Sequence, residues 1–257
     1  MSGDQLRPAA PRTRVAIVGS AGKMGQTLVR LANEDPEIEL VSVLDQGDPM
    51  NALAAFPGAV AIDFSSPSGT RALAEVAPAA GVSIVSGTTG LDDAAARALD
   101  EASRAVALFT AANMSIGVHV LGVLIERAIA MLGPGFDIEL VEAHHRRKVD
   151  APSGTALALA SIAQSAKAGG ASLVHGRQPG LRQARSTDEI GMHAVRGGDV
   201  IGDHTLYLFG DGERLELTHR ATNRDLFAHG ALRAAKWLAT QPPGRYGMEH
   251  LVGSAAP

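Results

Sequence analysis

The chain has 257 residues, of which 46% are hydrophobic, so it is long and apolar enough to fold into one large or two modest domains with a packed core. Its net charge of −4 argues against nucleic acid as a partner, because nucleic-acid-binding proteins usually carry a basic excess. The absence of cysteine excludes disulfides and cysteine-ligated metals, and no apolar run reaches the ~18 residues of a membrane span, so we expect a cytoplasmic protein without a membrane partner.

Short apolar segments alternate with amphipathic ones through the first half of the chain. Five segments have the β-branched or apolar character of buried parallel strands: Val15–Val18, Ile38–Leu44, Ala59–Phe64, Val82–Val85 and Ala105–Phe109. Three have helical spacing: Met24–Asn33, Thr70–Ala80 and a segment capped by Asp92 that runs to about Arg104. Repeated strand–helix units predict an α/β fold with a doubly wound parallel sheet of the Rossmann type.

The pattern changes after Asn113. Helices are predicted over Ile116–Leu132 and Ser153–Ala168, and strands over Asp137–Glu142, Gly191–Val195, Val200–Phe209 and Arg214–Thr218. Asp211 and Gly212 form a hairpin signal between the last two strands. We therefore predict a second α+β domain with a mostly antiparallel sheet.

A further helix over Asp225–Leu238 is expected to return to the first domain. We predict that residues 1–115, completed by 224–257, form a dinucleotide-binding domain. Residues 116–223 are then the substrate-binding and oligomerisation domain.

A glycine-rich turn lies between the first predicted strand and the first helix. Glycines at 19, 22 and 25 would let the backbone N–H groups of the helix start approach a pyrophosphate, which larger side chains would block. The turn is predicted to bind NADH or NADPH through Gly19, Ser20, Ala21, Gly22, Lys23, Met24 and Gly25. A strand-to-helix turn that merely needs glycine is the alternative.

The end of the second predicted strand carries a carboxylate suited to a ribose. Asp45 lies where dinucleotide-binding sheets place the acid that binds the adenosine ribose hydroxyls, although a surface aspartate is the alternative. Gln46 follows it and lacks the guanidinium that would clamp a 2′-phosphate. We therefore expect NADH to be used at least as well as NADPH.

Two more turns follow predicted strands at the edge where open α/β sheets bind ligands. Their small side chains and hydroxyls suit close approach to the nicotinamide ribose and amide, though each alone is an ordinary turn. The predicted cofactor contacts in them are Gly87, Thr88, Thr89, Ala111, Ala112, Asn113 and Met114.

The segment from Glu142 to Ala156 is the most informative one. His144, His145 and Lys148 lie in a basic run that is followed by a Ser-Gly-Thr at the predicted start of a helix. Such a helix start, beside cationic side chains, can bind carboxylates. A solvated basic loop is the alternative, but it does not explain the paired histidines and the helix start together.

This segment closely resembles the signature of the 4-hydroxy-tetrahydrodipicolinate reductase family, long called dihydrodipicolinate reductase. The resemblance extends over nearly the whole chain, through motifs at Val15–Gly25, Asp63–Pro67, Ser86–Gly90, Ala111–Gly117 and Arg196–His204. Two departures are Gln46, where some members have arginine, and a short Asp45–Ala59 segment.

The resemblance implies reduction of 4-hydroxy-tetrahydrodipicolinate, a small cyclic dicarboxylate, by NADH or NADPH with release of water, on the route to diaminopimelate and lysine. It implies that His144 and Lys148 are the acid/base pair, and that His145, Gly154 and Thr155 hold the substrate carboxylates. It also implies a homotetramer built through the second domain's sheet. No metal is required, and His204 and His219 are interpreted as structural or surface histidines.

Two alternatives stay open at this point. Another Rossmann imine or amino-acid dehydrogenase would share the glycine turn, but it has no reason to carry the paired histidines, Lys148 and the Ser-Gly-Thr. A non-catalytic nucleotide-binding relative would be expected to have lost His144 or Lys148, and both are present.

Overall fold

The computed structural model describes residues 11–167, 169–177, 180 and 184–253. These fall into two compact units, one of residues up to Met114 together with those from Asp225 onward, and one of Ser115–Arg224. The ends of the chain assigned to the first predicted domain, residues 1–10 and 254–257, lie outside the described residues, as does the predicted helix end at Ala168.

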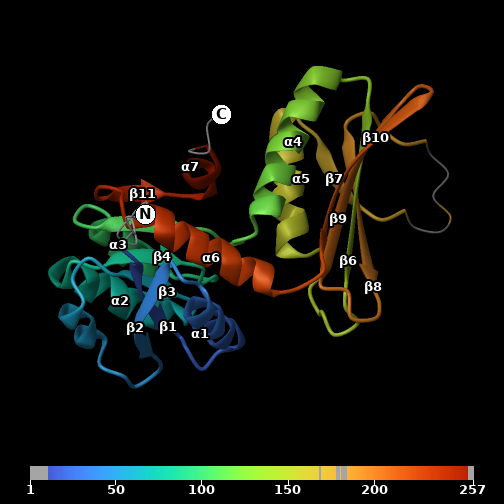
Figure 1. Ribbon diagram of the computed structural model, residues 1–257. Coiled ribbons are helices and arrows are strands. Elements are labelled where there is room, and N and C mark those ends of the chain that lie inside the picture. The colour runs from blue at the N-terminus through green and yellow to red at the C-terminus, as the bar shows by residue number, and fades with distance from the viewer. Residues whose placement is uncertain (1–10, 168, 178–179, 181–183, 254–257) are drawn as a thin grey trace, which may run out of the picture. The chain divides into compact units, whose positions relative to one another are not determined.

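The first unit is built on a six-stranded sheet in which every pairing is parallel (Figure 1). Its strands, in the order β11-β5-β4-β3-β1-β2, are β1 (Thr13–Val18), β2 (Ile38–Leu44), β3 (Val60–Asp63), β4 (Ser83–Ser86), β5 (Ala107–Thr110) and β11 (Gly244–Tyr246). The chain crosses from β2 back over β1 to β3, so the order in which strands are added to the sheet reverses between β1 and β3. Such sheets bind ligands at this point.

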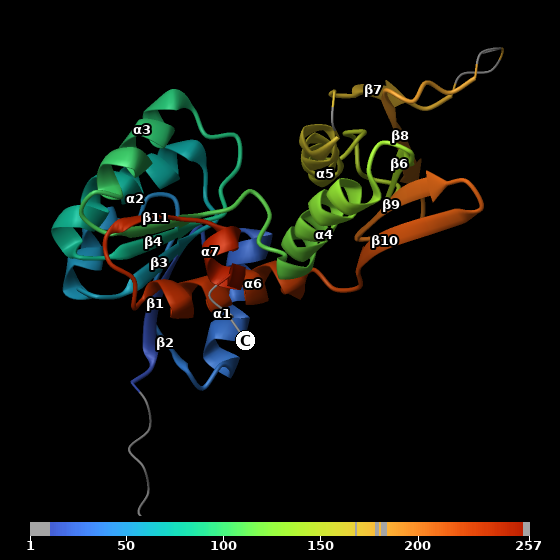
Figure 2. The same cartoon turned by 90° about the horizontal axis from the view of Figure 1, so that it is seen from above.

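Helices lie on both sides of this sheet, with α2 and α3 on one side and α1 and α6 on the other (Figure 2). The helices are α1 (Lys23–Glu34), η1 (a 3₁₀ helix, Met50–Ala55), α2 (Pro67–Ala80), α3 (Asp93–Ala102), α6 (Asp225–Leu238) and α7 (Met248–Gly253). Ser66 and Asp92 cap α2 and α3, each accepting a hydrogen bond from a backbone N–H of the first turn. The doubly wound parallel sheet is thereby confirmed.

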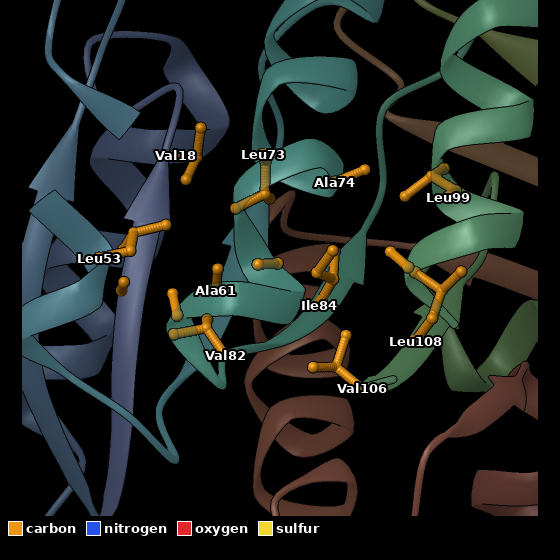
Figure 3. Close-up of a cluster of buried hydrophobic side chains, with 14 of the residues drawn as sticks. Val18, Leu53, Ala61, Leu73, Ala74, Val82, Ile84, Leu99, Val106 and Leu108 are labelled. Atoms are coloured by element: carbon orange, nitrogen blue, oxygen red, sulfur yellow. The ribbon is translucent and has the colours of Figure 1, made fainter. Parts of the chain in front are cut away.

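One apolar cluster fills the space between the sheet and α2, α3 and η1 (Figure 3). Alternate residues of the central strands point into it, such as Val18, Ala61 and Ile84, and they meet Leu73 of α2 and Leu99 of α3. All five are at most 2% exposed. This core holds the strand ends in place, and the turns predicted to bind the cofactor follow directly from them.

The second unit is a five-stranded sheet whose two helices, α4 (Ile116–Leu132) and α5 (Gly154–Ala166), pack on one face (Figure 1). Its strands, in the order β10-β9-β6-β8-β7, are β6 (Asp137–His144), β7 (Ser172–His175), β8 (Glu189–Arg196), β9 (Gly202–Gly210) and β10 (Glu213–Ala221). β9 runs antiparallel to both of its neighbours, and the hairpin at Asp211 and Gly212 joins it to β10. The α+β prediction is confirmed, with the addition that β8 and β7 extend the sheet in parallel from β6.

Candidate functional site

The glycine turn connects β1 to α1 in very little space. Gly19 has a positive φ of 83°, and a Cβ there would lie 2.6 Å from the carbonyl oxygen of Phe64. A Cβ on Gly25 would lie 2.1 Å from the carbonyl oxygen of Gly19. Both positions therefore require glycine, and the first turn of α1 opens at Gly22 without a side-chain cap. The exposed helix start is the geometry that a pyrophosphate needs.

Asp45 follows β2 beside this turn. One of its carboxylate oxygens accepts a hydrogen bond from the backbone N–H of Ala21, and the other accepts from its neighbour Gln46 at 2.7 Å. The backbone N–H of Asp45 in turn donates to Asp48 at 2.8 Å. The carboxylate is thus held against the glycine turn, and each oxygen keeps a lone pair for a further donor.

A cavity of about 590 Å³ opens at the carboxyl ends of β1, β2 and β3. It is lined by glycines of the turn, by Asp45, Gln46 and Asp48, and by Phe64–Ser66 after β3. Its place matches the reversal of strand order, and none of the described residues that line it is a lysine or an arginine. It suits the adenosine end of a dinucleotide.

Asp63, the last residue of β3, was not among the site residues predicted from the sequence. It is fully buried, and its carboxylate accepts five hydrogen bonds. The hydroxyls of Ser65, Thr70, Ser86 and Thr88 donate four of them, and the backbone N–H of Ser65 donates the fifth. This carboxylate therefore ties the turn after β3 to the turn after β4.

The two predicted nicotinamide turns follow β4 and β5, which are neighbours in the sheet. Gly87 approaches Phe64 so closely that a Cβ would lie 2.4 Å from its ring, and Thr88 is held by Asp63. After β5, Ala112 is exposed, whereas Met114 is only 2% exposed. Met114 thus belongs to the core, and any contact it makes with a ligand would have to use its backbone.

In the second unit, β6 carries the histidine pair at its end. Alternation along the strand places Glu142 and His144 on the face covered by the helices, where apolar side chains are usual. The Glu142 carboxylate accepts from Nδ1 of His144 at 2.6 Å and from the backbone N–H of Ser153, the cap of α5, at 3.1 Å. Arg196, on the neighbouring strand, donates to both carboxylate oxygens at 2.7 and 2.8 Å.

These contacts determine the ionisation of Glu142. Burial alone would raise its pKa, but hydrogen bonds from the Arg196 guanidinium, His144 and the Ser153 N–H hold the pKa below its ordinary value. The group is therefore a carboxylate, and its four hydrogen bonds use all of its acceptor positions.

A tight turn after β6 carries Lys148. The backbone N–H of Lys148 donates to the carbonyl of His145, and its ammonium pairs with the Asp150 carboxylate at 2.8 Å. Hydrogen bonding to Lys148 lowers the pKa of Asp150. Arg196 donates to the Asp150 carbonyl at 2.6 Å, so one guanidinium joins the His144 network to the Lys148 turn.

The three remaining predicted substrate residues lie next to this network. Gly154 and Thr155 are the first residues of α5, and Gly154 is exposed at this helix start. His145 is half-buried, and its pKa is lowered by burial and by the charges of Arg224 and Arg147. The helix start can therefore offer backbone donors to an anion beside a cationic turn.

His204 and His219, interpreted as structural or surface histidines, both lie in the second unit. His204 is 4% exposed, its Nε2 lies 3.3 Å from the hydroxyl of Ser153, and its ring packs edge-on against His144. Burial, followed by the charge of His144, lowers its pKa to about 4. The pKa of His219 is also lowered by burial, and its ring fills the space left by Gly117.

No group of three or more histidine, aspartate or glutamate side chains within the described ranges is arranged to hold a metal ion. In the same ranges, none of the helices combines the length and apolar character of a transmembrane segment.

Comparison with known families decides what this arrangement belongs to. The model for the N-terminal part of dihydrodipicolinate reductase matches residues 13–114, and the model for the C-terminal part matches residues 117–252. The chain belongs to the dihydrodipicolinate reductase family. As a member of that family it is an NAD(P)H-dependent oxidoreductase that acts on a small molecule, as the sequence motifs predicted.

Individual members of the dihydrodipicolinate reductase family are similar to this chain over most of their length. The 4-hydroxy-tetrahydrodipicolinate reductase of Nitratidesulfovibrio vulgaris (strain DSM 19637 / Miyazaki F) is 43% identical, with 90% of this chain and 96% of the relative covered. The enzyme of that name from Myxococcus xanthus is 42% identical, with 93% and 97% covered. A dipicolinate-bound dihydrodipicolinate reductase from Paenisporosarcina sp. TG-14 is structurally similar, with a TM-score of 0.77 at 25% identity and 93% and 99% of the two chains covered.

Proposed function

We propose that this chain reduces 4-hydroxy-tetrahydrodipicolinate to tetrahydrodipicolinate, and that His144 and Lys148 handle the proton that the reaction consumes. The observation that carries the proposal is the buried Glu142 carboxylate, which holds His144 and is joined through Arg196 to the turn of Lys148. The proposed substrate is taken from the 4-hydroxy-tetrahydrodipicolinate reductases to which this chain is similar.

The cofactor assignment follows from the glycine turn. Gly19 and Gly25 leave no room for a Cβ, and Asp45 is held beside them, which fits the pyrophosphate and ribose of a dinucleotide. When bound, NAD(P)H supplies the hydride. We assign the nicotinamide half to the turns at Gly87–Thr89 and at Ala111–Asn113, because they follow neighbouring strands at the same sheet edge.

Proton handling is the task of the second unit. The overall reaction consumes one proton with the hydride and releases water. The ammonium of Lys148 and the imidazole of His144 can each carry a proton, and as cations they stabilise negative charge that develops on the substrate. The N–H groups that open α5, at Gly154 and Thr155, and the side chain of His145 are suited to the two substrate carboxylates.

The decisive assay measures oxidation of NADH and NADPH. The substrate is generated in the cuvette from pyruvate and aspartate semialdehyde by the synthase that forms it. Substrate-dependent oxidation is expected. Folded protein that binds NADH but oxidises neither cofactor would contradict the proposal. That result would favour a different imine substrate, as in an amino-acid dehydrogenase, or a non-catalytic role.

NADH is expected to be the better cofactor. A 2′-phosphate would meet two carboxylates, Asp45 and Asp48, in a cavity where no lysine or arginine stands among the lining residues that the structure describes. Gln46→Arg should raise kcat/KM for NADPH by about tenfold, which corresponds to one charge-assisted hydrogen bond, and should change kcat/KM for NADH by less than about threefold. A wild-type enzyme that prefers NADPH would contradict this reading of the cavity.

We also propose a homotetramer in the cytoplasm, assembled through the sheet face that α4 and α5 do not cover. Val195 on that face is 51% exposed, and Tyr207 and Phe209 stack there with ring centroids 5.6 Å apart. Light scattering should give the mass of four chains, and Phe209→Asp should give a smaller species. A wild-type monomer would exclude the assembly.

A further inference from the structure

The hydrogen-bond donors around Glu142 differ in how freely they can change role. The backbone N–H of Ser153 and the guanidinium of Arg196 can only donate. A neutral imidazole can present either a donor or an acceptor at Nδ1, according to its tautomer. Among these donors, His144 is therefore the one whose Nδ1 could also accept a hydrogen bond. An ionised Glu142 restricts this nitrogen to donating.

Because a carboxylate only accepts hydrogen bonds, the 2.6 Å contact requires a proton on Nδ1 of His144. In the neutral ring, Nε2 then carries the lone pair. Space beside Nε2 is kept by Gly202, where a Cβ would lie 3.0 Å from that nitrogen. His204, whose ring packs edge-on against His144, directs its own Nε2 to the hydroxyl of Ser153 at 3.3 Å.

We propose that Glu142, clamped by Arg196, is a positioning residue that keeps the His144 proton on Nδ1 and so reserves Nε2 for the substrate. This inference deepens the proposed function and rests on it for the role of His144. The chemistry is that of a buried carboxylate fixing the tautomer and orientation of a working imidazole. Arg196 acts one step further away, because it holds the carboxylate in place and neutralises its charge.

Glu142→Gln tests the inference through the geometry of the amide. One carboxylate oxygen serves Ser153 and Arg196, and the other serves His144 and Arg196. The amide oxygen is best placed at the first position, since the NH₂ would there oppose two donors that cannot change. The NH₂ group then faces Nδ1 of His144, which must accept, and the proton moves to Nε2.

The expected readouts are spectroscopic and kinetic. In ¹⁵N-histidine-labelled protein, with the His144 signals assigned by their loss in His144→Gln, the neutral wild-type ring should carry its proton on Nδ1 and the Glu142→Gln ring on Nε2. The wrong tautomer should lower kcat by about 10²-fold or more, while KM changes by less than about threefold.

Glu139→Gln is the matched control. Glu139 lies on the same strand but on the other face, and its carboxylate likewise accepts from a histidine, His193, and from two arginines, Arg177 and Arg185. This variant should keep the His144 tautomer and, at an unchanged assembly mass, keep kcat within about threefold. It separates the loss of a partly buried charged network on the same strand from the loss of the Glu142 network.

A wild-type His144 with its proton on Nε2 would overturn the inference, and that measurement does not depend on whether Glu142→Gln folds. A Glu142→Gln enzyme with the flipped tautomer and normal kcat would also overturn it. If the wild type has the Nδ1–H tautomer but does not reduce the substrate, the proposed function fails while the tautomer assignment stands.

Discussion

Lys148→Ala is expected to lower kcat by about 10²–10⁴-fold, because a positioned proton donor contributes on that order. The Lys148 ammonium is held at 2.8 Å by Asp150 on a turn that Arg196 ties to the His144 network, so it is preorganised rather than a freely moving surface lysine. The measurement is the steady-state rate of NADH oxidation at saturating substrate. A near-normal kcat in this variant would remove Lys148 from the mechanism.

Lys148→Arg separates proton transfer from charge. A guanidinium keeps the positive charge and can still attract a carboxylate, but it does not give up its proton at working pH. We therefore expect KM to stay within about threefold while kcat falls at least tenfold. Recovery of kcat in this variant would mean that Lys148 acts through its charge alone.

Asp63→Ala is expected to lower the free energy of unfolding by about 3–5 kcal/mol, because it removes the acceptor of a buried hydrogen-bond network. Four hydroxyls and one backbone N–H lose their partner together, from Ser65, Thr70, Ser86 and Thr88. The same loss frees the turn after β4, so NADH affinity should fall as well. Urea unfolding and NADH titration measure the two effects.

Asp100→Ala serves as the control for this measurement. Asp100 is an acidic residue of the same unit, but its side chain is 53% exposed and its ion pair with Arg245 lies at the surface. Exposed ion pairs contribute little, so the change should be below about 1 kcal/mol. Equal stabilities of the Asp63→Ala and Asp100→Ala proteins would contradict the role given to the buried carboxylate.

Most of the fold could be predicted because hydrophobic periodicity marks it directly. The segments it missed are ones in which that signal is weak. β7 is four residues long, Ser172–His175, and none of its side chains is buried, so its pattern resembles a loop. β6 extends to His144, two residues beyond its predicted end, because Glu142 and His144 occupy inward positions where the periodicity leads one to expect apolar side chains.

Only part of the candidate site, likewise, could be predicted from the sequence. The glycine turn, Asp45 and the histidine–lysine segment are local motifs, so the sequence alone predicts them as candidate-site residues. It does not predict their supports, because the partners are far apart along the chain: Arg196 is 54 residues from Glu142, and Thr88 is 25 from Asp63. Such contacts exist only once the strands have paired, and no local pattern encodes them.

The second unit interrupts the first in the chain, since unit one resumes only at Asp225. Helix α6 of the first unit buries residues such as Ala231 and Leu238. A Cβ on Gly230 of this helix would lie 1.8 Å from the carbonyl oxygen of Met114. During synthesis the first unit therefore emerges with five of its six strands, and the whole second unit must follow before α6 and β11 are made. The inserted unit is contiguous and can mature first, so the part of the protein made earliest is completed last.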